Sequence, residues 1–508
     1  MNSASDELFG HPKGLYVCFA TELWERFSFY GMRFLLLLYL TKYHLFTDVE
    51  GLNVLGAYAG LAYALPVIGG LLADRYLGMR KAVMFGGILL VLGHFGMAFE
   101  GDSAYVANGQ IVRDTGALQI FYLSLALIAV GVGFLKPNIS TIVGRLYAEN
   151  DPRRDSGFTI FYMGINIGAF TATLLCGWLG ETLGWGYGFG AAGVGMLFGL
   201  ATFSWGQKFL HGLAEPSDPA ALVSRILPGI SRETAIYLGS IASLAAVWWL
   251  VQRNPIVHDL LISLSVVLLV GIIWFLRKCT RIERQRMLVL IVLIFSTVVF
   301  WSLFEQAAAS MTLFADRVVD RSAFGFQLNA SQIGAFNSLF IMLLAPVFAW
   351  VWIKLAARGL EPSTPVKFGL GIIQAGLGFG ALVFGSQFPD ATGHIALIWL
   401  VLAYLLHTTG ELCLSPVGLS AVTKLSVPRV VGVMMGAWFL ATAYSENLAA
   451  QISKLAAIET VPGESVDIAV QLATYTELFG LLFWIGVSVG VVMLILSPLL
   501  RKGMHGVN

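Results

Sequence analysis

The sequence predicts an all-α protein that crosses a membrane fourteen times. Three features lead to this prediction: the composition, the number of long apolar runs and the placement of the basic loops. Of the 508 residues, 57% are hydrophobic and 12% are charged, whereas soluble domains average about 45–50% apolar and roughly 25% charged residues. Because a helix that crosses a bilayer needs about 20 mainly apolar residues, this composition favours many spans.

Apolar runs of the required length recur along the whole chain, and short polar stretches separate them. The run that holds Lys136, Pro137 and Asn138 can continue as a kinked helix toward Arg145. The predicted spans are 15–41, 51–73, 81–99, 117–136, 157–181, 185–206, 232–252, 258–277, 287–314, 330–354, 366–387, 394–424, 430–457 and 472–500.

Basic residues in short loops predict the orientation, because positively charged side chains collect in cytoplasmic loops. Alternate loops carry them, and the loops between carry acidic residues, with Arg317 and Arg321 as partial exceptions. The basic loop residues are Arg75, Arg80 and Lys81; Arg145, Arg153 and Arg154; Arg277, Lys278, Arg281, Arg284 and Arg286; Lys354 and Arg358; and Lys424 and Arg429. Both termini are therefore expected in the cytoplasm.

A polar stretch at 207–232 divides the spans into groups of six, two and six. It contains Pro216, Pro219 and Pro228, and such a stretch is typical of a linker. We therefore expect a six-helix bundle over 1–206, a cytoplasmic linker with two inserted helices over 207–286, and a second six-helix bundle over 287–508.

Two six-helix halves, apart from the inserted pair, resemble the major facilitator fold. The loop after the second span resembles the GxxxDRxxGxRK loop motif of that superfamily through Gly70, Asp74, Arg75, Gly78, Arg80 and Lys81. This resemblance implies a site near the bilayer midplane, between halves that rock to alternate access. The loop itself has two readings, a latch that holds neighbouring helices in one state or a simple topology anchor.

Charge and cysteine content argue against several other functions. The net charge is +1, and no block of like charges is present that could follow nucleic acid. The four cysteines, Cys18, Cys176, Cys279 and Cys413, lie far apart and form no CxxC pair. We therefore expect neither disulfides nor a metal site.

The first span carries four charges, Glu22, Glu25, Arg26 and Arg33. Each costs about 2.5–3.5 kcal/mol near the centre of a membrane helix, so such side chains must face protein or water. Positions 22, 26, 30 and 33 share one helix face, which also holds Tyr30, and Glu22 can pair with Arg26 one turn away. A packing ion pair that only fixes the helix register is the alternative, but four charges exceed what register requires.

Three more charged residues lie within other apolar runs. Lys136 precedes Pro137, and its ammonium either snorkels to the cytoplasmic edge or projects into a cavity. Glu305 and Glu411 lie in the second half. A zwitterionic substrate needs a positive locus for its carboxylate and a negative locus for its amine. The two halves supply opposite poles.

Three segments resemble the signatures of the proton-dependent oligopeptide transporter family. Residues 22–31, ELWERFSFYG, are similar to its ExxERFxYYG motif, residues 161–170 to its fifth-helix motif and residues 410–418 to its tenth-helix motif. Together they span most of the chain. The sequence departs from the family at Phe29, where tyrosine is common, and at Ser338, where proline is common after Asn337.

The resemblance implies proton-driven symport of di- and tripeptides into the cytoplasm of a bacterium, across its inner membrane. It implies a monomer with no cofactor and no enzymatic activity. The proton-coupling and gating residues would be Glu22, Glu25, Arg26 and Glu305, the last able to pair with Lys136 or Arg33. Arg33 and Lys136 would hold the peptide carboxylate, and Glu411, with Asn166 and Asn337, the amino group. The pocket walls would include Tyr30, Tyr63, Tyr162, Trp301, Phe304 and Trp438.

Two alternatives stay open. The same fold could carry nitrate, a drug or another small anion, because intramembrane charges alone say only that something polar crosses. An intramembrane hydrolase is the more distant alternative, since His407, Glu411 and Ser415 recur at four-residue steps on one helix. Successive turns rise about 5.4 Å, so hydrogen bonds along that face would be strained.

Overall fold

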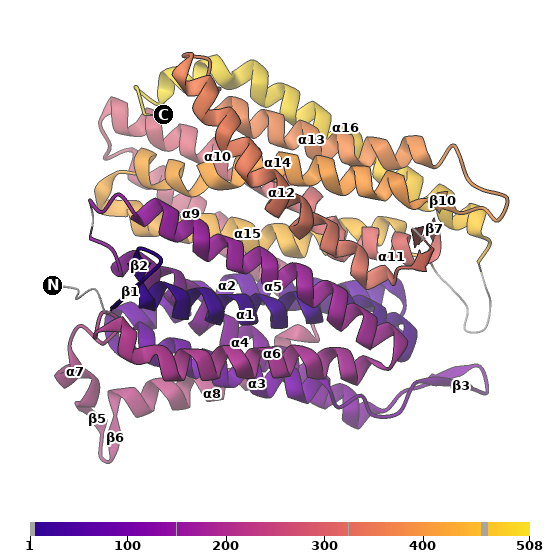
Figure 1. Cartoon of the computed structure of the whole chain (residues 1–508), viewed down its shortest axis with the longest axis horizontal. Coiled ribbons are helices and arrows are strands. Elements are labelled where there is room, and N and C mark those ends of the chain that lie inside the picture. The colour runs from indigo at the N-terminus through magenta and orange to yellow at the C-terminus, as the bar shows by residue number, and fades with distance from the viewer. Residues whose placement is uncertain (1–5, 149, 324, 459–465, 508) are drawn as a thin grey trace. The chain divides into compact units, whose positions relative to one another are not determined.

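A computed structural model describes residues 6–148, 150–323, 325–458 and 466–507. Helices dominate it (Figure 1). The long ones are α1 (Lys13–Leu38), α2 (Asp48–Leu72), α3 (Met79–Met97), α4 (Thr115–Arg145), α5 (Arg154–Thr182), α6 (Trp185–Gly206), α8 (Arg232–Val251), α9 (Asn254–Leu276), α10 (Arg281–Phe304), α12 (Ala335–Ala357), α13 (Thr364–Gly385), α14 (Leu397–Leu425), α15 (Val431–Ser453) and α16 (Ile468–Gly503).

Shorter helices connect or extend the long ones. They are the π-helical η2 (Tyr39–Tyr43) and η3 (Ala73–Leu77), the 3₁₀ turns η4 (Gln207–Leu210), η5 (Glu305–Ala308), η6 (Ala330–Gly334), η7 (Pro428–Val430) and η8 (Lys454–Ala456), and the α-helices α7 (Pro219–Val223) and α11 (Ser310–Arg317).

In the part of the chain that the structure describes, strands occur only as short pairs in the connections. Four pairs are antiparallel hairpins: β1 (Glu7–Leu8) with β2 (His11–Pro12), β3 (Tyr105–Ala107) with β4 (Gln110–Val112), β5 (Arg225–Leu227) with β6 (Ile230–Ser231), and β8 (Ser322–Ala323) with β9 (Phe326–Gln327). The fifth pair is parallel and joins distant segments, β7 (Val319–Asp320) and β10 (Ile395–Ala396).

The fourteen predicted spans are confirmed as long helices. In the described residues, twelve helical segments are long and apolar enough to cross a membrane. The other two are α1 and α15, which have the length but carry polar groups: Lys13 and the four charges of the predicted first span in α1, and Ser445, Glu446 and Asn447 in α15. The continuation of α4 to Arg145 is also confirmed.

One predicted span, 287–314, differs from the structure because it is interrupted. Helix α10 ends at Phe304, η5 follows, and Ala309 (φ −119°, ψ −104°) breaks the helix before α11. The side chain of Gln306 stabilises the break: its amide donates to the Ala449 carbonyl at 3.0 Å and accepts from the hydroxyls of Ser310 and Ser453 at 2.5 and 2.7 Å. Glu305, Gln306 and Ser310 are polar, but polar residues also lie within uninterrupted helices such as α1, so they did not predict the break.

Polar caps fix several helix starts. The carboxylate of Asp114 accepts from the backbone N–H of Ala117 at 3.0 Å before α4, and these backbone hydrogen bonds hold the pKa of Asp114 below its ordinary value. Thr280 and Glu283 form a reciprocal capping box at the start of α10. Such caps satisfy backbone N–H groups that the helix leaves open.

The chain divides into two compact units, residues 1–45 with 57–254 and residues 46–56 with 255–508. Helix α8 therefore belongs to the first unit and α9 to the second. The predicted boundaries at 206 and 286 separate the two six-helix bundles from the linker and the inserted helices. The division into compact units does not test these boundaries, which stay a prediction.

In the first unit, α1 packs against α5 and α6, and α3 packs against α4. The contact between α1 and α5 is close because Gly168 has no side chain: a Cβ built there would lie 2.2 Å from the Leu23 carbonyl oxygen. A glycine at this point lets two backbones approach, as is common between membrane helices.

The loop between α2 and α3 is bound to the linker within the same unit. Gly78 adopts φ +74°, and a Cβ there would lie 2.5 Å from the Pro216 nitrogen. Arg80 pairs with Glu215 and donates its backbone N–H to the Ala214 carbonyl at 2.9 Å. The contacts hold this basic loop to a segment that follows the sixth predicted span.

Lys81, the last residue of the loop motif, reaches α8. Its ammonium lies 2.7 Å from the Glu233 carboxylate, and the ring of Phe85 one turn later lies 4.9 Å from that of Tyr237. Helix α8 also packs along α4. The first inserted helix is thus fastened to the first unit by an ion pair and by aromatic contact.

In the second unit, α13 lies between α14 and α16, and α10 packs against α15. Asp48, at the start of α2, belongs to this unit and forms a bidentate ion pair with Arg317 at 2.6 and 2.7 Å. Its carboxylate also accepts from the Ile458 backbone N–H at 3.0 Å. This ion pair accounts for Arg317 as an exception to the basic-loop pattern.

Candidate functional site

The charged residues of α1 form a buried ion cluster. Glu22, Glu25 and Arg26 are 4%, 0% and 3% exposed. The guanidinium of Arg26 binds both oxygens of Glu25, one of them at 2.6 Å, and its Nε lies 3.3 Å from Glu22 Oε1. The expected Glu22–Arg26 pair is therefore present, but the closer partner of Arg26 is the adjacent Glu25, which the helical spacing did not single out.

Glu22 keeps one oxygen without a partner. Its Oε2 is buried and accepts no hydrogen bond from the described residues. A buried carboxylate oxygen that nothing solvates is a place where a proton binds readily. Lys136 lies near enough to interact with the Glu22 charge.

Phe29 lies under two guanidinium groups. Its ring centroid is 5.0 Å from the Arg26 Cζ and 5.6 Å from the Arg33 Cζ, and the ring packs edge-on against Tyr30 and Tyr63. Phe29 is 2% exposed. The sequence marked it only as a departure from the family motif, and no residue pattern signals its contact with two cations.

Lys136 faces the interior of the first unit. Its Nζ lies 4.0 Å from the centroid of the Tyr63 ring, a cation–π contact that fixes the ammonium among protein groups. Of the two readings left by the sequence, snorkelling to the membrane edge and projection into the protein, the contact with Tyr63 favours the second.

The fifth-helix motif supplies Tyr162 and Asn166 from α5. Asn166 is 4% exposed and donates its amide to the Tyr162 carbonyl one turn earlier at 3.0 Å. The side chain of Tyr162 is exposed. The first unit thus holds every predicted site residue before position 254: Glu22, Glu25, Arg26, Tyr30, Arg33, Tyr63, Lys136, Tyr162 and Asn166.

In the second unit the structure places Asn337 of α12 beside Glu411 of α14. The Asn337 amide donates to Glu411 Oε2 at 3.1 Å and to the hydroxyl of Thr408 at 3.1 Å. Thr408 in turn donates to the Tyr404 carbonyl at 2.7 Å. Glu411 is 8% exposed. Thr408, which lies one turn before Glu411 on the same face, was not among the predicted site residues.

The remaining predicted residues of the second unit lie on α10, η5 and α15. Trp301 packs edge-on against Phe304 at 5.1 Å, and Glu305 opens the 3₁₀ turn that interrupts the helix. Trp438 is 6% exposed and covers Gly418 of the tenth-helix motif, where a Cβ would lie 2.2 Å from the indole. Trp438 therefore packs α15 against α14.

The contacts of α14 do not form the hydrolase triad considered above. His407 Nε2 is hydrogen-bonded to the Ala375 carbonyl of α13 at 3.0 Å, and its ring packs 4.8 Å from that of Phe379. Glu411 is bound to Asn337 of α12. The His407 side chain thus binds α13, and the Glu411 side chain binds α12. Among the described residues, no group of three His, Cys, Asp or Glu side chains could hold a metal.

The fourteen long helices of the described residues, with charges buried inside two compact units, define a membrane transporter. The family model of the POT family matches residues 80–468. This match covers more than half of the 508 residues, and the chain belongs to the POT family.

Individual relatives agree with this assignment. The chain is 39% identical to the uncharacterized transporter YclF of Bacillus subtilis over 98% of this chain and 96% of that protein. It is 38% identical to the peptide transporter YePEPT of Yersinia enterocolitica over 87% of each. It is 34% identical to a di-/tripeptide transporter of Lactococcus lactis, covering 100% of this chain and 99% of that one.

Solved structures show the same fold over nearly the whole length. A peptide transporter POT in complex with sulfate superposes with a TM-score of 0.82 at 35% identity, covering 98% of this chain and 97% of that chain. A POT family transporter in complex with 5-aminolevulinic acid superposes with a TM-score of 0.80 at 29% identity, covering 97% and 98%.

Proposed function

We propose that the protein is a monomeric symporter that moves di- and tripeptides together with protons into the cytoplasm across a bacterial inner membrane. Both termini would lie in the cytoplasm, as the basic loops indicate. The observation that carries the proposal is the division of intramembrane charge: the buried Arg33 and the half-buried Lys136 are in the first unit, and the buried Glu411, held by Asn337, is in the second. These are the two poles that a peptide zwitterion requires.

The names of relatives supply independent support for the substrate. YePEPT and the Lactococcus lactis protein are named as peptide transporters, and the chain resembles both over most of its length. Peptides vary in their side chains but share an amino group, a carboxylate and a backbone. A site that fixes the shared groups by charge and leaves apolar aromatic walls for the rest accepts many of them.

Proton coupling is assigned to the α1 cluster. Glu22 would take the proton on its unpartnered Oε2. Protonation removes the negative charge of Glu22 and so weakens its ion pair with Arg26. The positive charge of Arg26 would then be available to attract the peptide carboxylate. Glu305 would act as an alternative partner for Lys136 or Arg33 during the cycle. No cofactor is needed, because the proton gradient supplies the driving force.

The test is uptake of radiolabelled dialanine by the purified protein in liposomes. We expect uptake when the interior is made alkaline and negative, loss of uptake when an ionophore collapses the gradient, and recovery of the peptide intact. If the gradient failed to drive dialanine uptake, the peptide assignment would be abandoned, and cleavage of the recovered peptide would restore the hydrolase alternative.

Another small solute on the same fold is the second candidate, because one solved relative is in complex with 5-aminolevulinic acid. That compound is also a zwitterion. Competition assays separate the candidates: we expect unlabelled dipeptides to block dialanine uptake more strongly than 5-aminolevulinic acid or nitrate does. The opposite order would move the assignment to the other solute.

A further inference from the structure

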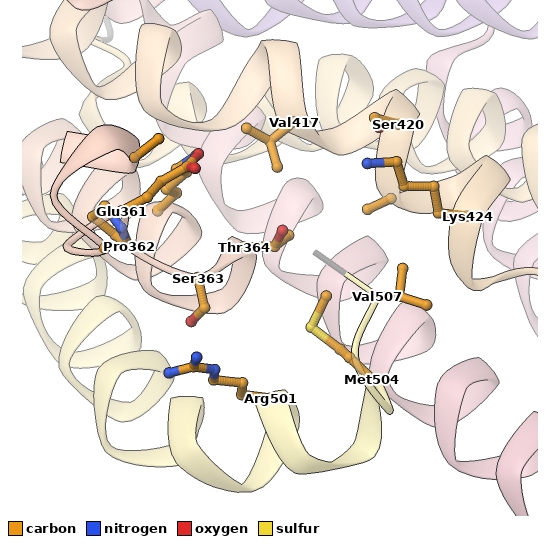
Figure 2. A pocket seen from close by; sticks show the side chains of 14 residues that line it. Glu361, Pro362, Ser363, Thr364, Val417, Ser420, Lys424, Arg501, Met504 and Val507 are labelled. Atoms are coloured by element: carbon orange, nitrogen blue, oxygen red, sulfur yellow. The ribbon is translucent and has the colours of Figure 1, made fainter. Parts of the chain in front are cut away.

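A polar cavity of about 540 Å³ lies in the second unit, away from the predicted peptide and proton residues. It is formed by the connection between α12 and α13, by α14 and by the end of α16 (Figure 2). Its charged lining residues are Lys367, Lys424, Arg501 and Glu361. Three cations face one carboxylate, so the cavity carries an excess of positive charge.

The carboxylate of Glu361 already forms an ion pair. Glu361 lies 2.6 Å from the ammonium of Lys367, which is 7% exposed and also lies 4.8 Å from the Trp352 ring. Among the described residues, the guanidinium of Arg501 forms no ion pair. Figure 2 shows that this guanidinium points toward the hydroxyl of Ser363, and that the Lys424 ammonium extends into the cavity.

The start of α13 adds donors to the same cavity. Ser363 is its N-cap residue, but its side chain does not cap the helix. The backbone N–H groups of Thr364 and Val366 therefore stay open and carry a positive partial charge, whereas Pro365 has no N–H. The side chain of Thr364, the first residue of α13, lines the cavity, is 6% exposed and has no hydrogen-bond partner in the described part of the chain. A hydroxyl that lines a cavity and has no protein partner can donate to a ligand there.

The first unit shows what such basic groups bind elsewhere in the protein. There, Arg80 and Lys81 lie in the first turn of α3 and pair with Glu215 and Glu233, two carboxylates from the linker and α8. At the start of α13, the basic residue Lys367 pairs with Glu361. The other two cations of the cavity, Lys424 and Arg501, come instead from the last turns of α14 and α16.

We propose that this cavity binds a phosphate-bearing anion. The Arg501 guanidinium, the open start of α13 and the hydroxyls of Ser363 and Thr364 are donors of the kind that phosphate oxygens use in proteins, and Lys424 adds positive charge beside them. The volume exceeds that of one phosphate, and Val417, Ala421 and Met504 line the rest, so a phosphate ester fits better than the bare ion. The ester is either a soluble phosphorylated metabolite or the head group of an anionic phospholipid, since the basic loops place this end of α14 in the cytoplasm.

Two binding measurements on the purified full-length protein distinguish the sources. Equilibrium dialysis in neutral detergent at low ionic strength measures radiolabelled glycerol 3-phosphate, with inorganic phosphate as competitor. Native mass spectrometry measures retention of phosphatidylglycerol against phosphatidylcholine. Binding in the first measurement identifies a soluble ester, and selective retention in the second alone identifies a lipid head group.

Variants test the site itself. We expect Arg501→Gln combined with Lys424→Gln to weaken binding at least about tenfold, the effect of losing roughly 1.4 kcal/mol, and Thr364→Val to weaken it less. Lys502→Gln is the matched control, because Lys502 is an exposed neighbour that does not line the cavity. Thermal unfolding in detergent verifies that each variant folds, and Thr364→Val carries the test if the double variant does not.

Two results would overturn the proposal. One is absence of binding in both measurements, and the other is an equal loss of binding in Lys502→Gln and in the Arg501→Gln, Lys424→Gln double variant, which would indicate diffuse surface charge. Neither measurement uses a peptide or a proton gradient. A failure of peptide uptake is therefore distinguishable from a failure at this cavity.

Discussion

At the scale of single residues, Phe29 holds together two groups of like charge. Arg26 and Arg33 both lie over its ring, at 5.0 and 5.6 Å from the centroid. The negative face of an aromatic ring attracts cations, and it lets two buried guanidinium groups share one helix face. The hydroxyl of the more common tyrosine is not needed for this contact.

Replacing Phe29 by Leu should weaken peptide binding. Each cation–π contact is worth about 0.5–2 kcal/mol, so we expect KM for dialanine to rise by about threefold to thirtyfold, while Phe29→Tyr keeps the ring and stays near the parent. Uptake kinetics in liposomes measure both. An unchanged KM in Phe29→Leu would show that Arg33 is positioned by other contacts.

Replacing Glu22 by Gln should separate transport from its driving force. The amide cannot take up and release a proton, so gradient-driven accumulation should disappear while exchange of labelled for unlabelled peptide across the membrane continues. Glu477→Gln is the matched control, because Glu477 is an exposed carboxylate on the membrane helix α16. Equal accumulation in Glu22→Gln and the control would remove Glu22 from the coupling site.

His44, in the connection after η2, should make stability depend on pH. Burial, followed by the charge of Arg113, lowers the pKa of His44 from 6.5 to about 4. The pKa of His44 is lower in the folded protein than in the unfolded chain, so below pH 6.5 the imidazole must lose a proton when the protein folds. The free energy of unfolding therefore has its full value above pH 6.5 and decreases as the pH falls toward 4. Between pH 7.5 and pH 5 we expect a loss of about 1–2 kcal/mol.

The measurement for His44 is thermal unfolding in detergent at the two pH values. His44→Phe retains a ring that can pack against Tyr39, now 4.7 Å away, and removes the titrating group. The difference in Tm between pH 7.5 and pH 5 should therefore shrink in this variant. A difference as large as that of the parent would assign the acid sensitivity to another residue.

At the scale of elements, close helix contacts depend on glycines that have different surroundings. Gly168→Ala would place a methyl 2.2 Å from the Leu23 carbonyl oxygen and push α5 away from α1. Overpacking of this kind costs about 1–3 kcal/mol, which should appear as a lower Tm. Gly239→Ala in α8 is the control, since nothing lies within 4 Å of a Cβ there, and alanine favours the helix. Equal Tm values would show that the α1–α5 contact adjusts freely.

The sequence predicted the helices well because crossing a bilayer demands long apolar segments, and periodicity placed Glu22 and Arg26 on one face. It did not predict the break at Ala309, since Gln306 stabilises that turn through groups on α11 and α15. The contacts of Phe29 and of Thr408 were also missed. Each depends on which helices become neighbours, and a single chain read linearly does not contain that information.

At the scale of the whole molecule, proton coupling predicts how accumulation varies with membrane potential. One elementary charge moving through 100 mV is worth about 2.3 kcal/mol, and a tenfold concentration ratio is worth about 1.4 kcal/mol. If one proton accompanies one neutral dipeptide, accumulation should rise about tenfold for each additional 60 mV. Potassium diffusion potentials across liposomes set the voltage. A ratio independent of voltage would contradict charge movement in the cycle.

The β5–β6 hairpin has a practical consequence for experiments on this protein. Its tip holds Pro228 and Gly229, and Gly229 adopts φ +83° with nothing within 4 Å of a Cβ. The ion pairs of Glu215 and Glu233 lie on either side and fasten the flanking segments. Exposed tips of this kind accept inserted sequence. A small epitope placed between Pro228 and Gly229 would give electron microscopists a rigidly mounted landmark on a molecule otherwise hidden in its detergent belt.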